Sequence, residues 1–262
     1  MKVKKIGLAL GSGGSRGVAH IGVIKALEEE GIKPDYITGC SMGAVVGACY
    51  ASGMTADKMK EAVMQIKPLD LIDVNLNLRQ SVLKGNKVYD MLIKEIGSVR
   101  FDELKIPFQC VASDMLSNKL ILLKEGEVAT AVRASSAIPL VFSPVSYEDK
   151  LLIDGGVLCR IPVEQVRDMG ADVVIAVDVL DNTRAPAEKV SGFIATMMRV
   201  YDMIDNNRTD YFKQIVSDKK TLWIVPQMEG MSQYKIKGLD TAYTEGYELT
   251  KQLMPQIKAL IK

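Results

Sequence analysis

Residues 35–53 read DYITGCSMGAVVGACYASG, in which GCSMG at 39–43 joins an apolar run to a run of small and apolar residues. The pattern G-x-S-x-G between a strand and a helix is typical of a nucleophile elbow, a sharp turn that exposes a serine hydroxyl at the edge of an α/β sheet. We therefore predict a strand over 35–39, a buried helix over 43–53 and a nucleophilic role for Ser41.

Small residues surround this serine. A strand and a helix approach each other closely at such an elbow, so the flanking positions have no room for bulky side chains. Gly39 and Gly43 flank Ser41 as the turn requires, and the helical run continues with small residues: Ala44, Gly47 and Ala48. These residues are predicted to support the motif.

A second glycine-rich loop, GSGGSRG at 11–17, stands between an apolar strand pattern and a helical pattern over 18–32. Such a loop lets backbone N–H groups point together, and the following helix adds its positive end, which suits an oxyanion hole. Two other interpretations are a plain tight turn and a dinucleotide phosphate loop, with Asp35 near the place of a ribose-binding acid. The dinucleotide pattern, counted from Gly11, requires a third glycine where Arg16 stands.

The chain has a single histidine, His20, which precedes Ser41. In α/β-hydrolases the histidine follows the serine, so that triad order is excluded. Because His20 lies in a helical pattern among apolar residues, we expect it to support the glycine loop rather than to act as the base. Arg16 is expected either to bond carbonyl groups of the loop or to meet an anionic head group.

An aspartate is the remaining candidate for the base. Asp154 ends the apolar strand of LLIDGGVLCRIP (151–162), where α/β sheets place functional groups, and Gly155 and Gly156 follow it. Burial without a nearby cation would raise the pKa of this carboxyl group and make it a better proton acceptor. A plain Asx turn after a strand explains the stretch equally well.

The composition limits the classes of protein that fit. The 262 residues carry a net charge of +1, which provides no field that would attract nucleic acid. With one histidine and scattered cysteines, no metal site is expected: Cys40, Cys49, Cys110 and Cys159. The first apolar run is shorter than a secretory signal needs, and no run reaches the roughly 18 residues of a spanning helix. We expect a cytoplasmic protein whose membrane contact is transient and superficial.

Strand and helix patterns alternate along the chain, which favours a three-layer α/β/α domain with a mainly parallel central sheet. We expect a single domain over 1–262, with its core motifs in 5–180 and a mainly helical part in 185–262. The other expected elements are a helix over 55–66 capped by Thr55, a strand pair over 106–126, a helix over 127–139 that Pro139 ends, a long helix over 190–216 and a last helix over 243–254.

Two further segments each leave alternatives open. Residues 67–85 lack a clean period, so they form either a lid or interfacial contact near the site or an ordinary buried connection. Met197 and Met198 are expected to pack in the core or at a dimer contact, so a homodimer remains an open prediction.

The glycine-bearing segments, in this order, resemble the patatin-like phospholipase family, and especially its small bacterial members. They are GSGGSRG (11–17), GCSMG (39–43) and DGG (154–156), and AVRASSAIPLVFSPV (131–145) is also similar. The resemblance runs from about residue 5 to residue 180. It implies a three-layer α/β/α fold and the hydrolysis of acyl esters, from phospholipids to simple lipids, without metal or cofactor.

The resemblance also implies roles for residues. Ser41 matches the nucleophile and Asp154 its partner in a Ser–Asp dyad, with supporting glycines at the motifs: Gly11, Gly39, Gly43, Gly155 and Gly156. The oxyanion hole would be formed by the glycine loop and the residue after the nucleophile: Gly13, Gly14, Ser15, Arg16 and Met42. The chain departs from the family at Arg160, where asparagine is common, and this bears on the local turn and on head-group preference.

A lipid or another acyl ester is therefore the expected substrate. The alternatives are a weakly active or non-catalytic regulatory or lipid-binding protein with the same fold, and a thioesterase or transferase that acts on acyl carriers. Hydrolysis of short p-nitrophenyl esters would separate the catalytic interpretations from the non-catalytic one.

Overall fold

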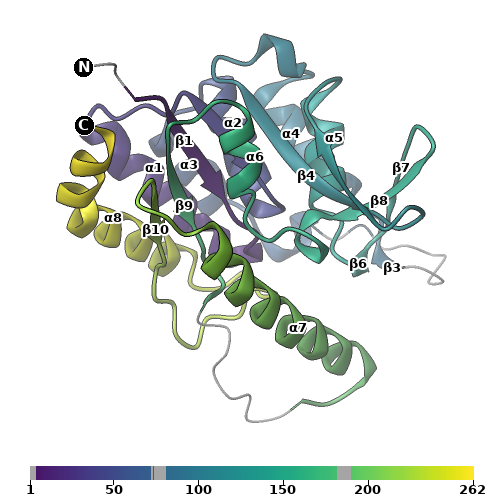
Figure 1. The fold of residues 1–262 in the computed structure, drawn as a ribbon. Helices are drawn as coiled ribbons and strands as arrows, with labels where there is room; N and C mark the ends of the chain where they lie inside the picture. Colours follow the sequence, from purple (N-terminus) through teal and green to yellow (C-terminus); the bar gives the residue numbers. More distant parts are fainter. Residues whose placement is uncertain (1–3, 72, 74–80, 182–189) are drawn as a thin grey trace.

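The computed structural model describes residues 4–71, 73, 81–181 and 190–262. Within this part of the chain, one sheet has the strand order β10-β9-β1-β2-β4-β8-β7, and β5 also pairs with β4 (Figure 1). The strands from β10 to β4 are parallel to their neighbours, whereas β5, β7 and β8 pair antiparallel. The mainly parallel sheet is thus confirmed. Its strands are β1 (Ile6–Leu10), β2 (Tyr36–Gly39), β4 (Phe108–Asp114), β5 (Lys119–Leu123), β7 (Val145–Tyr147), β8 (Lys150–Asp154), β9 (Val173–Val177) and β10 (Thr221–Ile224).

The central strands β1 and β9 are short, entirely buried apolar runs, IGLAL and VVIAV. Strands covered by helices on both faces need apolar residues at every position, which explains why these runs do not alternate with polar residues. Leu10 at the end of β1 lies opposite Gly39 of β2 and Val177 of β9. This register brings the ends of three strands to one edge, where the glycine loop and the elbow begin.

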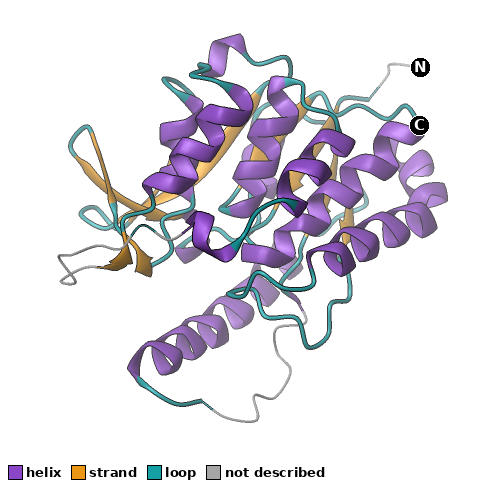
Figure 2. Cartoon of the chain, turned by 180° about the vertical axis from the view of Figure 1, so that it is seen from behind, coloured by secondary structure: helices purple, strands orange, loops and turns teal. Residues whose placement is uncertain are grey.

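Helices cover both faces of the sheet (Figures 1 and 2). Helices α1–α5 and α8 enclose the larger of two buried apolar clusters, and α6 with the end of α7 encloses the smaller one on the opposite face. The predicted three layers are therefore present. The helices are α1 (Ala19–Glu29), α2 (Met42–Ser52), α3 (Ala56–Met64), α4 (Asn86–Ile96), α5 (Val128–Ser135), α6 (Val163–Asp168), α7 (Phe193–Val216) and α8 (Leu239–Ile261).

The helix ends that the sequence predicts are confirmed only in part. Thr55 caps α3 as predicted, since its hydroxyl accepts a hydrogen bond from the amide of Lys58 at 3.4 Å. The helix α5 ends at Ser135, earlier than the predicted stop at Pro139. It ends early because the chain turns there to start a short strand, β6 (Leu140–Phe142), which the sequence did not reveal.

Helix α8 is longer than predicted and continues through Pro255. Close packing on α1 explains this difference, because an added Cβ at Gly22 would lie 2.1 Å from the carbonyl oxygen of Tyr243, and one at Gly246 would lie 2.1 Å from that of Ala19. Contacts of this kind, which depend on the tertiary structure, override the local preference of a proline to end a helix.

Only part of the predicted lid segment 67–85 is described. It contains a 3-10 turn (Pro68–Leu71) and strand β3 (Ser81–Leu83), which pairs in parallel with β6. Leu69 is 72% exposed. Residues 72 and 74–80 lie outside the described residues, so the lid stays a prediction.

Met197 lies on α7 and is 37% exposed, so the prediction that it packs in the core is wrong. The alternative, a dimer contact, stays a prediction. Among the described residues, the helices are either too short or too polar to span a bilayer.

Candidate active site

Ser41 lies at the predicted elbow, between the end of β2 and the start of α2. Its backbone has φ 54° and ψ −122°, a left-handed conformation that costs a non-glycine residue free energy and is common at nucleophile elbows. The Ser41 amide donates to Ser135 Oγ at 3.0 Å, which holds the turn. The flanking glycines are required sterically, because an added Cβ at Gly39 would lie 2.5 Å from Ala44 Cα and one at Gly43 would lie 2.2 Å from a carbonyl oxygen.

Asp154 ends β8 beside this serine. Both residues are only 3% exposed. The Oδ1 atom of Asp154 accepts a hydrogen bond from the amide of Gly156 at 2.7 Å, while Oδ2 has no well-aligned partner in the described part of the chain. The Ser41 hydroxyl is close enough to act on the carboxylate as a donor.

Burial raises the pKa of Asp154 to about 6, although hydrogen bonds from Ser41 and Gly156 act in the opposite direction. A carboxyl group in water has a pKa near 4 and is a weak base. The buried group is thus a stronger proton acceptor, and it is still ionised at neutral pH.

The backbone amides of the glycine loop divide into two groups. The amide of Ser15 donates to the carbonyl of Gln233 at 3.0 Å, and that of Arg16 donates to the carbonyl of Gly13 at 3.0 Å. Within the described residues, no hydrogen bond engages the amides of Gly13, Gly14 and Met42. Of the five residues predicted to form an oxyanion hole, Ser15 and Arg16 thus have their amides already engaged, and the oxyanion hole itself stays a prediction.

Arg16 holds the loop in place. Its buried guanidinium group donates to the carbonyls of Met231 at 2.8 Å and Met228 at 2.9 Å. Bonding of carbonyl groups, one of the two predicted roles, is present, and contact with an anionic head group stays a prediction. The carbonyls belong to a segment far along the chain rather than to the loop itself.

His20 has the structural role expected from the sequence. It is fully buried, and its Nε2 atom lies 2.8 Å from the carbonyl oxygen of Gly11, to which a neutral imidazole donates. Burial lowers the pKa of His20 to about 4. The ring therefore stays neutral at physiological pH and supports the start of the glycine loop.

The remaining motif glycines sit where a side chain would collide with backbone or with the site. An added Cβ would lie 2.9 Å from the Val177 carbonyl oxygen at Gly11, 2.3 Å from the Val111 carbonyl oxygen at Gly155, and 3.0 Å from Asp154 Oδ1 at Gly156. Their predicted supporting function has a steric basis.

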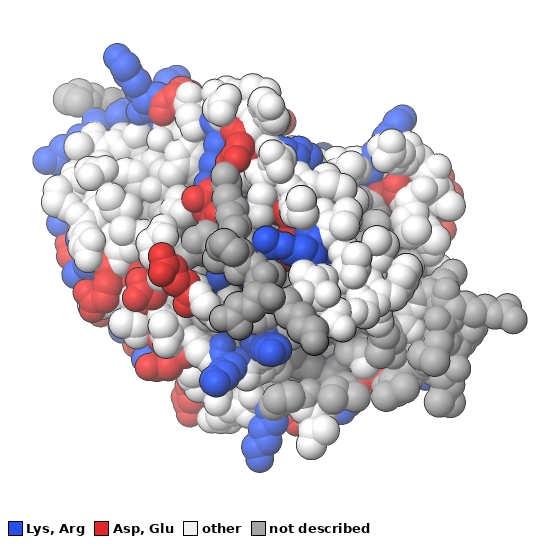
Figure 3. Space-filling model, turned by 90° about the horizontal axis from the view of Figure 1, so that it is seen from below, with Lys and Arg blue, Asp and Glu red and all other residues white. Residues whose placement is uncertain are grey.

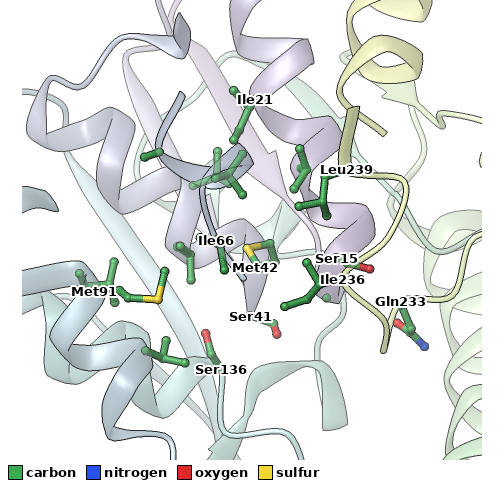
Figure 4. Close-up of a pocket in the computed structure, with 18 of the residues that line it drawn as sticks. Ser15, Ile21, Ser41, Met42, Ile66, Met91, Ser136, Gln233, Ile236 and Leu239 are labelled. Atoms are coloured by element: carbon green, nitrogen blue, oxygen red, sulfur yellow. The ribbon is translucent and has the colours of Figure 1, made fainter. Parts of the chain in front are cut away.

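An apolar cavity of about 750 Å³ opens beside Ser41. Figure 4 shows the Ser41 side chain near Ser136, Met42 and Ile236, with Met91 farther away. The walls come from α2, α3, α4 and the segment 233–239. The Ser136 hydroxyl is buried and has no hydrogen-bond partner among the described residues. A cavity of this size with few polar groups is suited to an apolar ligand.

A second, much smaller cavity of about 20 Å³ touches Asp154. It is lined by polar groups from the loop and from α7, including Ser12, Tyr201 and Asp205. Burial and the charge of Asp154 raise the pKa of Tyr201, so its hydroxyl remains protonated. Nothing in the sequence pattern of α7 pointed to Tyr201 as part of this site.

Arg160, the departure from the family pattern, is buried. Its guanidinium group contacts Asp178 at 2.5 Å, Asp205 at 3.2 Å and Asn206 at 2.9 Å. Burial would raise the pKa of Asp178, but the charges of Arg160 and Lys213 outweigh it and lower the pKa to about 2. Arg160 therefore ties the end of β9 to α7.

We expect Arg160→Met to destabilise the protein by about 3 kcal/mol or more, because it removes the largest counter-charge of buried Asp178 and one of the two arginines that pair with Asp205. Urea unfolding followed by circular dichroism measures the change. The matched control is Arg167→Met, a more exposed arginine that bonds Val216 and Asp218, which should cost about 1 kcal/mol or less. Equal losses for the two variants would contradict this account of the cluster.

Among the described residues, no group of three or more His, Cys, Asp or Glu side chains could hold a metal ion. The fold is similar to that of solved bacterial proteins. VipD from Legionella pneumophila matches with a TM-score of 0.62 and 15% identity over 97% of this chain and 67% of that one. ExoU of the type III secretion system of Pseudomonas aeruginosa matches with a TM-score of 0.52 and 13% identity over 99% of this chain and 53% of that one.

Sequence comparison defines the family. The model of the patatin-like phospholipases matches residues 8–167, so the chain belongs to the patatin-like phospholipase family. An NTE family protein of Mycobacterium tuberculosis is 38% identical over 185 residues, which cover 70% of this chain and 51% of that protein. Lysophospholipase NTE1 of Coccidioides immitis is 29% identical over 97% of this chain but only 18% of its own length. The chain thus spans about half the length of the mycobacterial relative.

Proposed function

We propose that this protein is a serine acyl-ester hydrolase of the lipase or lysophospholipase type. The observation that carries the proposal is the position of Ser41, on a strained turn between a buried carboxylate with a pKa of about 6 and an apolar cavity of about 750 Å³. Membership of the family and the similarity to a fungal protein that is named a lysophospholipase add support.

In the first half of the reaction, Asp154 accepts the proton of Ser41 as Oγ attacks the ester carbonyl carbon. Negative charge then develops on the carbonyl oxygen, and the unengaged amides of Gly13, Gly14 and Met42 stabilise it. The intermediate collapses, the carbon–oxygen bond to the alcohol breaks, and protonated Asp154 returns its proton to the leaving alcohol. The acyl group remains on Ser41.

In the second half, water must reach the acyl carbon from the side of Asp154. The small polar cavity suits this role, because about 10–15 Å³ is enough to hold one water molecule and this cavity measures about 20 Å³. Asp154 takes a proton from the water, the hydroxyl attacks the acyl carbon, and the proton returns to Ser41 as the fatty acid leaves. Tyr201 and Ser12 provide hydroxyl groups that orient the water.

The shape of the apolar cavity favours an ester with one long acyl chain. The cavity follows one side of α2 from Met42 through Val45 to Cys49. At 1.5 Å per residue, this path extends about 12 Å from Ser41. Because an extended chain advances roughly 1.3 Å per carbon, the straight path accommodates about nine carbons. A lysophospholipid or monoacylglycerol satisfies this requirement.

We expect Cys49→Phe to shorten the preferred acyl chain, since the larger side chain would enter the cavity about two helical turns from the nucleophile. The ratio of kcat/KM for palmitate over butyrate esters should fall at least about tenfold. Cys49→Ala is the matched control and should keep the wild-type ratio. A Cys49→Phe enzyme with an unchanged ratio would place the acyl chain elsewhere.

The proposed function is tested by a panel of p-nitrophenyl esters, an acyl thioester, lysophosphatidylcholine and diacyl phosphatidylcholine. The expected result is faster hydrolysis of single-chain esters than of the diacyl lipid. A preference for the thioester would favour an acyl-carrier thioesterase. Absence of hydrolysis across the panel, together with lipid binding, would favour the non-catalytic alternative.

A further inference from the structure

The outer side of α7 is an apolar surface at the bottom of the molecule. The exposed large apolar side chains in its first twelve residues are Phe193, Ile194, Met197, Val200, Met203 and Ile204. Phe193 is 74% exposed and Ile204 is 63% exposed. Figure 3 views the molecule from below, and uncharged side chains form much of that face, with both basic and acidic groups between them. Apolar surface on this scale, when it is exposed, usually marks a contact with another surface.

The breadth of this surface argues against a second copy of the chain as its partner. At about 100° per residue, the six side chains cover roughly 180° of the helix circumference. A coiled-coil seam is narrower and continues at a spacing of three and four residues. One line of such a seam, Phe193 and Val200, continues into the exposed, polar Asn207 and Gln214, whereas the other line continues through the exposed Tyr211. An apolar face as broad as the one in the first half of α7 fits a flat apolar medium better than a matching helix.

The other side of the same helix completes the candidate active site. Tyr201 and Asp205 line the small cavity beside Asp154, and Asp205 binds Arg160 at 3.2 Å. A surface that covered the outer side of α7 would therefore lie next to the site into which a lipid must pass.

Two exposed cations, Lys235 and Lys237, are among the residues that line the apolar cavity. In the part of the chain that the structure describes, neither lysine is paired with an acidic side chain. Their segment contacts α7 through Gln233 and Tyr234, which donate to Asp202. Unpaired lysines in this segment complement the negative charge of an anionic lipid surface.

We propose that the outer side of the first half of α7, together with Lys235 and Lys237, docks on the surface of a bilayer that contains anionic phospholipid. The apolar side chains enter the boundary between head groups and acyl chains, and the lysines contact lipid phosphates. This arrangement holds the apolar cavity at the lipid surface. The docking does not depend on the Ser41 chemistry.

The test is flotation of the full chain with vesicles of phosphatidylcholine alone or mixed with phosphatidylglycerol. The Ser41→Ala background prevents lipid hydrolysis during the measurement. Binding should be stronger to the anionic vesicles and should weaken with salt. Phe193→Glu combined with Val200→Glu should lower the vesicle partition constant at least tenfold. The double change Lys235→Gln and Lys237→Gln should lower it only for anionic vesicles, by about fivefold for each lysine.

Leu116→Glu is the matched control, because Leu116 is 68% exposed in the turn between β4 and β5 rather than on α7. It should leave vesicle binding unchanged. On a wild-type Ser41 background, Phe193→Glu should also leave the hydrolysis of a water-soluble butyrate ester unchanged, which separates docking from catalysis.

Vesicle binding that is equal for Phe193→Glu/Val200→Glu and its parent would overturn the proposal. Light scattering measures the oligomeric state as a second test. If the parent forms a dimer that Phe193→Glu dissociates, and if the parent does not bind vesicles, the surface is a contact with a second copy of the chain.

Discussion

Replacing Ser41 with alanine should lower ester hydrolysis by at least about a thousandfold and should abolish labelling by a fluorophosphonate probe. Ser41, which lines the cavity, combines a strained elbow conformation with a nearby buried carboxylate. The variant should remain folded, because alanine removes only the hydroxyl group while the Ser41 amide keeps its bond to Ser135. The measurement is kcat/KM for a butyrate ester, with thermal unfolding as the check on folding.

Ser136→Ala is the matched control for this variant. Ser136 lines the same cavity and lies near Ser41 (Figure 4), but its hydroxyl group has no hydrogen-bond partner among the described residues. It should retain probe labelling and most of the turnover. Undiminished labelling of Ser41→Ala, or labelled peptides that map to another serine, would refute the proposed nucleophile.

Replacing Asp154 with asparagine should have two opposite effects. Turnover should fall at least about a thousandfold, because the amide cannot accept the Ser41 proton. Stability at pH 8 should rise by on the order of 2 kcal/mol, because the variant no longer buries a charge. Asparagine can still accept the hydrogen bond that the Gly156 amide donates. A residue that is required for activity would then be unfavourable for folding, as is common at active sites.

The sign of the pH dependence follows from the raised pKa of Asp154. In the unfolded chain this group has a pKa near 4, and in the folded protein it has a pKa of about 6. Its contribution to stability is therefore most favourable below about pH 4, decreases as the pH rises to about 6, and is constant above that value. The stability gain of Asp154→Asn should appear over the same range. Wild-type kcat/KM should rise with pH and level off above about 6.

Asp114→Asn is the control for Asp154→Asn. Asp114 ends the neighbouring strand β4, and donors led by the Ser117 hydroxyl lower the pKa of its carboxyl group. This variant should lose stability at neutral pH, while each folded molecule keeps its turnover. Asp154→Asn would contradict the proposed base if it kept wild-type kcat/KM, and it would contradict the burial argument if its stability gain were absent at pH 8.

The sequence predicted the parts of the site that depend on short-range constraints. GCSMG identified the elbow because a strand and a helix that meet so closely exclude side chains at Gly39 and Gly43. Because no histidine follows Ser41 in the sequence, a carboxylate was the remaining candidate for the base. The apolar strand that ends in Asp154 was sufficient to place that carboxylate at the correct edge of the sheet.

The sequence did not predict which amides of the glycine loop remain available. That selection depends on the Gln233 carbonyl, which engages the Ser15 amide and comes from an irregular segment with no periodic pattern. The sequence did not predict the position of Tyr201 for a related reason. In a helical pattern that is apolar on its outer side, the sequence cannot indicate which polar residue turns inward, since Arg160 and Asp205 decide the orientation of α7 through a long-range ion pair.

The contacts of Arg16 have a consequence for transferring this loop to other proteins. Its guanidinium group bonds carbonyls more than two hundred positions away, and the Ser15 hydroxyl does the same with Ser232. The direction of the free amides is therefore set by the far end of the polypeptide. Grafting GSGGSRG onto another strand–helix junction would transfer the residues of the loop without the distant segment that orients its backbone amides.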